Sequence, residues 1–440
     1  MVIKRNPGLF PWAMTTMVDF SVGGLVFILA PVSARILGVE GRGTLAAVQL
    51  VPVLLAQFSS VGTGYSLIHF GSKHVSGIKV FLRRSLYSAV AGSLVFYVIG
   101  QLVAASLALN PTEESMVRVY LFLCPLSALT AVMLDALRTL GLFVRWNVFT
   151  ALRLLIWPIS LLVGILQTPP SMWLIILLHL SLAAALLVIL SVEIWRVFGV
   201  SSETIDEGSI DIDEVTTRKY IKFGLNSLLG TIPAAANARL DQVIMISLVA
   251  KEELGLYAVA VGWSYITVPI MRSFALVTQS LTSSKVGEAQ KDYIQKVITV
   301  GAVTGVLVLV PSWALTLILW APLYGQEYRS ALASAMVMLL VSTLLQQNAL
   351  LANMLRSFES PTTVSMVEFP ILLVGIPLLF IALKFEPVLG ATLVSLATAV
   401  TANILFMHNI NKKLELSWRG TFRDLHRSGS LFPRAPWGRR

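Results

Sequence analysis

The chain has 440 residues, of which 56% are hydrophobic and only 13% are charged, and its mean hydropathy is +0.79. A soluble protein of this length could not keep so much apolar surface from water, so the composition predicts a polytopic membrane protein. The single cysteine, Cys124, excludes an intrachain disulfide, and the five histidines show no metal-ligand spacing. The formal net charge of +10 is therefore interpreted as a topology signal rather than as a nucleic-acid interface.

Apolar segments of about 20 residues or more can cross a hydrocarbon core of about 30 Å. Twelve such segments are predicted near residues 12–37, 45–70, 85–109, 117–141, 147–167, 171–195, 221–249, 254–280, 296–320, 329–353, 362–383 and 389–410. The connections between them are short and hold no nucleophile, metal-ligand or paired-acid pattern, so no catalytic or cofactor-binding residue is expected. The sequence therefore predicts an all-α membrane protein that is not an enzyme.

Lys and Arg gather in alternate connections between the predicted spans. Most of the 33 basic residues fall on one side, which includes Lys4, Arg84, Arg145 and the C-terminal tail, whereas Arg35, Arg118 and Lys384 are among the few on the other side. By the positive-inside rule, the basic side is cytoplasmic. We therefore expect a multi-pass protein of the plasma (inner) membrane with both termini in the cytoplasm.

The longest internal connection separates six spans from six and is rich in Asp and Glu. Its composition predicts a solvated linker rather than a binding site. The expected organisation is an N-terminal six-helix lobe (1–196), an acidic cytoplasmic linker (197–220), a C-terminal six-helix lobe (221–410) and a basic cytoplasmic tail (411–440). The tail predicts contact with anionic membrane lipids and no nucleic-acid partner.

The two halves resemble each other where the first span turns into the second and the seventh into the eighth. A shift of 212 residues superposes three residues of the first turn on three of the second: Glu40 on Glu252, Gly43 on Gly255, and Ala46 on Ala258. Each turn places Glu near the start of the following helix and small residues where helices pack closely. The repeat predicts two lobes related by a pseudo-twofold axis along the membrane normal, with a substrate site between them.

The seventh segment is the most polar of the predicted spans. On a regular helix Asn226, Asn237 and Asp241 fall on one face, and Arg239 points roughly to the opposite side. Pro233 lies inside the segment and should bend it. Polar side chains at membrane depth usually face a cavity, a partner or a ligand, so this bent segment predicts the moving wall of a transporter cavity.

Short runs resemble polysaccharide flippases of the multidrug/oligosaccharidyl-lipid/polysaccharide exporter superfamily: 34–43 (ARILGVEGRG), 237–242 (NARLDQ), 253–260 (ELGLYAVA) and 323–328 (LYGQEY). The resemblance covers the whole twelve-span layout. It implies a V-shaped, two-lobed fold that alternates between inward-open and outward-open states. It also implies a polyprenyl-diphosphate-linked sugar as substrate. The two extra spans common in lipid II flippases are missing, which disfavours a peptidoglycan precursor.

A diphosphate headgroup that crosses the membrane needs fixed cations, and arginine matches phosphate oxygens without titrating away. Arg239 and Arg272 are the candidates, with interfacial snorkelling as the alternative for Arg272. Amides suit sugar hydroxyls. The predicted substrate-binding residues of the cavity are Arg239, Arg272, Asp241, Asn237, Asn226 and Gln346.

Other intramembrane carboxylates suggest ion coupling or gating. Asp19, midway through the first span, is a candidate for binding H⁺ or Na⁺, with a permanent arginine pair as the alternative. Asp241 shares this logic. Asp135 and Glu368, near cytoplasmic span ends, are interpreted as gate or structural residues.

The predicted function is a flippase that moves a lipid-linked oligosaccharide to the outer leaflet for O-antigen, capsule or exopolysaccharide synthesis, with polymerase and export proteins as partners. One alternative is a cation-coupled exporter of drugs or small molecules from the same superfamily, because the candidate carboxylates outnumber the candidate arginines. A second alternative is a scaffold for polysaccharide synthesis that transports nothing.

Overall fold

A computed structural model describes residues 9–72, 77–200, 216–229, 232–271, 288–358 and 362–414, and within these ranges it contains helices and no strands. In chain order the elements are α1 (Leu9–Phe58), α2 (Thr63–Gly71), α3 (Ile78–Ser106), α4 (Pro111–Tyr120), α5 (Leu123–Thr139), α6 (Phe143–Leu166), α7 (Met172–Val200), α8 (Thr217–Leu229), α9 (Ile232–Asn237), α10 (Leu240–Leu248), α11 (Lys251–Ser264), η4 (Tyr265–Thr267), α13 (Glu288–Tyr324), η5 (Gln326–Ala331), α14 (Leu332–Phe358), α15 (Thr362–Ala382) and α16 (Pro387–Leu414).

Ten helical stretches among the described residues are long and apolar enough to cross a membrane. The stretch Phe20–Gly71 contains the first two predicted spans, because α1 bends at Gly38, where φ is +67° and a glycine is favoured. The described parts of the seventh predicted span are the helices α8, α9 and α10. The helices therefore fit the twelve predicted spans.

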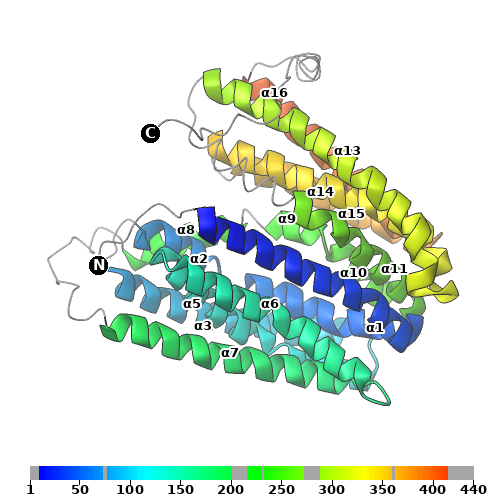
Figure 1. The fold of residues 1–440 in the computed structure, drawn as a ribbon, viewed down its shortest axis with the longest axis horizontal. Coiled ribbons are helices and arrows are strands. Elements are labelled where there is room, and N and C mark those ends of the chain that lie inside the picture. The colour runs from blue at the N-terminus through cyan, green and yellow to red at the C-terminus, as the bar shows by residue number, and fades with distance from the viewer. Residues whose placement is uncertain are drawn as a thin grey trace.

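The helices form two groups, a first lobe built from α1–α7 and a second lobe built from α9–α16. Figure 1 shows the two groups close together beside the far end of α1 and spread apart where α1 begins. Because α1 bends at Gly38, the end where the groups meet is here called the Gly38 end. Each lobe has its own buried apolar cluster, around Phe81 in the first and Phe406 in the second. A larger cluster joins Ala47 of α1 to Tyr257 of α11 and thus bridges the lobes.

The repeated turns meet each other across the two lobes. A methyl group at Gly43 would lie 1.9 Å from the carbonyl oxygen of Lys251, and one at Gly255 would lie 2.1 Å from that of Val39. The 212-residue shift maps Val39 on Lys251 and Gly43 on Gly255, so the two contacts are equivalent and related by the pseudo-twofold axis. As predicted, small residues allow close packing at these turns, and Glu252 lies in the first turn of α11.

The first piece of the broken seventh segment packs on the first lobe. Tyr220 of α8 is fully buried, its hydroxyl lies 2.6 Å from Ser85 Oγ, and its ring stacks on Phe81 with centroids 5.5 Å apart. Ser66 Oγ donates to the Tyr220 carbonyl at 2.9 Å. A methyl group at Gly62 would lie 2.2 Å from the Gly224 carbonyl oxygen.

The sequence predicted that the second lobe begins at residue 221, but α8, which spans this position, packs on the first lobe. The buried face of α8 repeats every four residues, at Tyr220, Gly224 and Leu228, and it packs against the first lobe. The chain passes to the second lobe only at α9. Pro233 lies in the first turn of α9, and a break follows at Ala238–Arg239, which the single proline did not predict.

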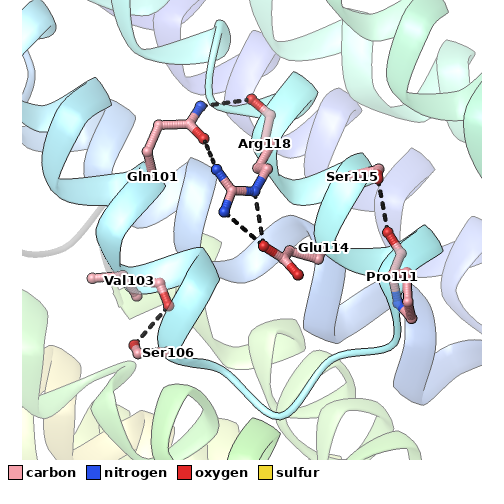
Figure 2. A network of polar contacts seen from close by, with 7 residues as sticks. All are labelled: Gln101, Val103, Ser106, Pro111, Glu114, Ser115 and Arg118. Carbon is pink, nitrogen blue, oxygen red and sulfur yellow. Dashed lines mark hydrogen bonds and ion pairs between the residues drawn. The ribbon is translucent and has the colours of Figure 1, made fainter.

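The helix α4 is bonded to α3 of its own lobe at the Gly38 end. Figure 2 shows Arg118, whose guanidinium bonds Glu114 Oε1 at 2.7 and 2.9 Å and Gln101 Oε1 of α3 at 3.0 Å. Gln101 Nε2 in turn donates to the Arg118 carbonyl at 3.2 Å. Asn110 and Glu113 form a capping box at the start of α4.

Candidate functional site

A cavity of about 400 Å³ lies in the second lobe and is lined by parts of α9, α10, α11, α14, α15 and α16. Its polar lining residues are Gln57, Asn237, Asp241, Ser264, Tyr265, Ser342, Gln346, Asn348, Glu368, Ser395 and Thr398. Gln57 belongs to α1, so the first lobe also contributes to the wall. None of the described residues that line the cavity is Lys, Arg or His.

Asp241 is held by hydrogen bonds from neutral donors. Its Oδ1 accepts the backbone N–H of Gln242 at 2.7 Å, and its Oδ2 accepts the hydroxyls of Tyr257 and of Ser395, the latter at 3.1 Å. Three helices, α10, α11 and α16, thus meet at one carboxylate. Buried charge is costly unless it is compensated, so a cation that reaches this oxygen would be strongly stabilised.

A second carboxylate faces the same cavity from α15. Glu368 is 8% exposed, and its Oε2 accepts the side-chain N–H of Asn237 at 2.6 Å. The same amide lies 3.3 Å from the Glu368 carbonyl oxygen. Sequence reasoning assigned Glu368 to a gate or a structural pair near a span end, whereas the structure places it beside the cavity.

The amides of α14 divide into two kinds. Asn348 is committed to the fold, because its Nδ2 donates to the Ala399 carbonyl at 2.9 Å and its Oδ1 accepts from Asn403 at 2.8 Å. Gln346 and Gln57 line the cavity from opposite lobes. Their amides are placed to bond a ligand that touches both lobes.

Arg239 lies at the break between α9 and α10, outside the set of residues that line the cavity. Its guanidinium carbon lies 5.4 Å from the centre of the Tyr265 ring, and Tyr265 does line the cavity. Arg239 is therefore in contact with Tyr265, an aromatic residue of the cavity wall. A cation over an aromatic face is attracted by the ring quadrupole.

Asn226 does not join this cavity and lies on the exposed face of α8, which packs on the first lobe. The helical-wheel prediction assumed one continuous helix, whereas α8 packs on the first lobe and α9 packs on α15 of the second, so Asn226 lies apart from Asn237 and Asp241. Asn237, Asp241 and Gln346, which were predicted to bind substrate, line this cavity together.

The other predicted residues lie elsewhere. Asp135 of α5 packs in the first lobe, where a methyl group at Gly64 would lie 2.0 Å from its Oδ2, and it interacts electrostatically with Arg138 and Arg153. Asp19 belongs to α1, but its side chain is outside the described part of the structure. Arg272 and the tail beyond residue 414 are also outside the described residues.

Sequence reasoning missed Gln57, Tyr257, Ser395 and Thr398. Gln57 is an amide inside an apolar span, and Ser395 and Thr398 are three residues apart on one helix, so both signals were present in the sequence. Their convergence depends on packing between segments far apart in the chain, which periodicity along one helix does not report.

Comparison with solved structures shows which known fold the chain shares. The chain resembles the lipid II flippase MurJ in an inward closed conformation (TM-score 0.69, 12% identity, covering 94% of this chain and 90% of that one). It also resembles an inward-facing multidrug resistance MATE family transporter of the MOP superfamily (TM-score 0.65, 15% identity, 91% and 95%). Identities this low show the fold alone. The chain thus has the two-lobed, all-α membrane fold of these proteins, as the sequence predicted.

The family follows from the sequence match. Residues 32–332 match the model of the family described as polysaccharide biosynthesis protein. Since this region is more than half of the chain, the protein belongs to that polysaccharide biosynthesis family, and the predicted resemblance is confirmed at this level. No curated protein sequence matches the chain.

Proposed function

We propose that this protein is a flippase that moves a polyprenyl-diphosphate-linked oligosaccharide from the cytoplasmic to the outer leaflet. The product would serve synthesis of O-antigen, capsule or exopolysaccharide. The observation that carries the proposal is a polar cavity of about 400 Å³, with walls from both lobes, in a member of a polysaccharide biosynthesis family. Alternating access then presents one cavity to each side of the membrane in turn.

The lining suits a saccharide. Sugar hydroxyls both donate and accept hydrogen bonds, and the cavity offers amides (Gln57 and Gln346), hydroxyls and the Tyr265 ring. A ligand bonded by Gln57 and Gln346 contacts both lobes at once, so its binding favours one arrangement of the lobes over another. Arg239, beside Tyr265, and Arg272 are proposed to meet the diphosphate.

Coupling to H⁺ or Na⁺ is proposed to act through Asp241, with Asp19 as a second candidate. Asp241 is bonded by neutral donors from three helices, so a cation bound there would change how α10, α11 and α16 pack. Asp135 is proposed to keep its structural role in the first lobe. No other cofactor is proposed.

The protein is proposed to lie in the plasma (inner) membrane with both termini in the cytoplasm. The Gly38 end then faces the outside, because Lys and Arg are concentrated in the opposite connections. Anionic inner-leaflet lipids are the proposed partners of the basic tail, and polymerase and export proteins are the proposed partners in the pathway.

The test is the leaflet distribution of lipid-linked oligosaccharide in cells that lack the protein. Substrate should accumulate on the cytoplasmic leaflet and be cleared by the wild type but not by Arg239→Ala. Arg329→Ala is the matched control, because Arg329 is an exposed arginine of the same lobe on η5. Normal outward display without the protein would reject the flippase proposal.

A cation-coupled exporter of small organic cations is the second candidate. It is favoured by the two carboxylates, Asp241 and Glu368, in a cavity whose described lining residues include no Lys, Arg or His. Altered tolerance to cationic drugs with normal saccharide display would support it. If neither drug tolerance nor saccharide display changes, a scaffold that transports nothing becomes the favoured function.

A further inference from the structure

We propose that the segment Leu323–Tyr328, where α13 ends and η5 begins, is the receptor of a latch that holds the two lobes together at the Gly38 end. Arg35 of the first lobe is the arm of this latch, and the Glu113–Lys251 ion pair is its second fastening. Releasing these contacts would open the Gly38 end. The latch depends on the two-lobed fold and stands whichever substrate the protein carries.

The arm reaches the end of a helix that belongs to the other lobe. Arg35 Nε donates to the Leu323 carbonyl at 2.7 Å, and its NH2 group donates to the Pro322 carbonyl. The helix α13 ends at Tyr324, so these carbonyls have no donor within the helix. A cation at a helix C-terminus is favoured by the helix dipole, which gives this contact its direction.

A second bond runs in the opposite direction between the lobes. The Tyr328 hydroxyl donates to the Ala34 carbonyl at 3.1 Å, one residue before Arg35. Neighbouring residues of α1 thus give a donor and an acceptor to the same turn. A shift of either lobe by a few ångströms would break both bonds, because hydrogen bonds weaken steeply with distance and angle.

The receptor is held by several contacts within its own lobe. Gly325, at φ +85°, makes the turn, and its N–H donates to the Ala321 carbonyl at 3.0 Å. Trp320 Nε1 donates to the Tyr328 carbonyl at 3.0 Å, and the Tyr324 and Tyr328 rings lie 5.7 Å apart. Tyr328 is fully buried. Because these contacts within the second lobe hold the turn, less of it has to be ordered by Arg35, which lowers the entropic cost of closure.

The second fastening joins α11 to α4. Lys251 Nζ lies 2.5 Å from Glu113 Oε1, and the Glu113 side chain is only 5% exposed. Glu113 is positioned by its own lobe, since Asn110 N–H donates to its Oε2 at 3.3 Å. The Arg118 network of Figure 2 fixes the helix that carries it. A fixed, buried carboxylate thus meets a cation supplied by the other lobe.

The latch differs in kind from the glycine packing beneath it. Gly43 and Gly255 allow contact but give no directional bond, whereas Arg35 and Lys251 give charge-assisted bonds that water can replace. Arg35 is exposed, so its release leaves no buried charge behind. These contacts therefore bias the lobes toward closure at this end without preventing opening.

The test measures how often this end opens, using purified protein in lipid nanodiscs. Cys124 is replaced by Ala, and Ala47, which is 2% exposed within the cluster that bridges the lobes, becomes the only cysteine. Maleimide then reacts only when the lobes part. Arg35→Gln and Lys251→Gln should each speed labelling about tenfold, which corresponds to about 1.4 kcal/mol. The double variant should approach roughly 100-fold.

Matched variants separate the latch from general loosening. Arg329→Gln removes an exposed arginine at the same end and leaves the named contacts intact, so its labelling rate should equal the parent rate. Glu113→Gln keeps the capping box, because glutamine also serves at that position, and should match Lys251→Gln. Unchanged labelling in Arg35→Gln and Lys251→Gln overturns the latch. Equal acceleration by Arg329→Gln overturns it as well.

Discussion

The two lobes share a turn but differ in what they bury beside it. At the 212-residue shift that superposes Gly43 on Gly255, Leu29 corresponds to Asp241 and Leu25 to Asn237. Leu29 is buried in the first lobe, whereas Asp241 and Asn237 line a polar cavity in the second. The repeat has kept its packing and has placed polar chemistry in one lobe.

The difference extends to the backbone. In the first lobe α1 is helical from Leu9 until it bends at Gly38, whereas in the seventh segment a turn at Ala238–Arg239 separates α9 from α10. Breaks leave backbone and side-chain polar groups to be satisfied, and irregular backbone at membrane depth is tolerated where it is buried or lines a cavity. The second lobe thus combines an irregular segment with the cavity, and the first lobe acts as the more regular frame.

Asp241→Asn is the substitution that should break this asymmetry most strongly. It keeps the shape of the side chain but removes the charge to which three helices donate. Interactions with charged groups are worth about 1.5–3 kcal/mol, so coupled export should fall roughly 10- to 100-fold. Surface polysaccharide formed by complemented cells measures this. Asp135→Asn, the matched change in the first lobe, should cost much less, and an equal loss in both would contradict the assignment.

Gly43→Ala and Gly255→Ala should test the shared packing. Each methyl group would enter a carbonyl oxygen at about 2 Å, and such overpacking costs about 1–3 kcal/mol. The melting temperature of the purified protein should fall by a similar amount in both. Gly24→Ala and Gly262→Ala are the controls on the same two helices, since a methyl group there meets nothing within 4 Å. A loss at only one of the paired glycines would show that the turns are not equivalent.

Tyr220→Phe should weaken the attachment of α8 to the first lobe. The change removes a buried hydroxyl 2.6 Å from Ser85 Oγ and leaves the ring stacked on Phe81. We expect a loss of about 1 kcal/mol, read as a lower melting temperature and faster proteolysis near residue 216. Tyr65→Phe, at an exposed tyrosine of α2, should change neither quantity. Equal proteolysis of both variants would mean that this hydroxyl does not hold α8.

Arg118→Met should have the smallest effect. Its side chain is 42% exposed and pairs with Glu114 four residues earlier, and exposed pairs of this kind contribute about 0.3–0.5 kcal/mol. The melting temperature should change little, and the rate of maleimide labelling at the Gly38 end should rise less than in Lys251→Gln. A large loss would show that fastening within the lobe matters as much as fastening between lobes.

The sequence predicted the features that depend on local pattern. Apolar length identified the spans, and the spacing of Gly43 and Gly255 identified the repeated turn that the structure places face to face. Pro233 indicated a bend in the seventh segment. Asn237, Asp241 and Gln346 were predicted to share a cavity, and they do.

Features that depend on packing between distant segments were not predicted. Asn226 was placed with Asp241 because a helical wheel assumes an unbroken helix. Gln57 reaches the second-lobe cavity from the first lobe, and Tyr257 reaches Asp241 from a neighbouring helix, which only the tertiary arrangement determines. The boundary at residue 221 followed the apolar pattern, which says nothing about which lobe Tyr220 contacts.

The attachment of α8 to the first lobe means that the covalent link between residues 200 and 216 need not hold the lobes together. Tyr220, Gly224 and Leu228 bury one stripe of α8 in the first lobe, while α9 is already part of the second. If the chain were divided inside that link, the C-terminal polypeptide would carry α8 and the N-terminal one the surface of the first lobe on which α8 packs. Co-expressed, the two halves should associate and restore the activity of the full-length protein.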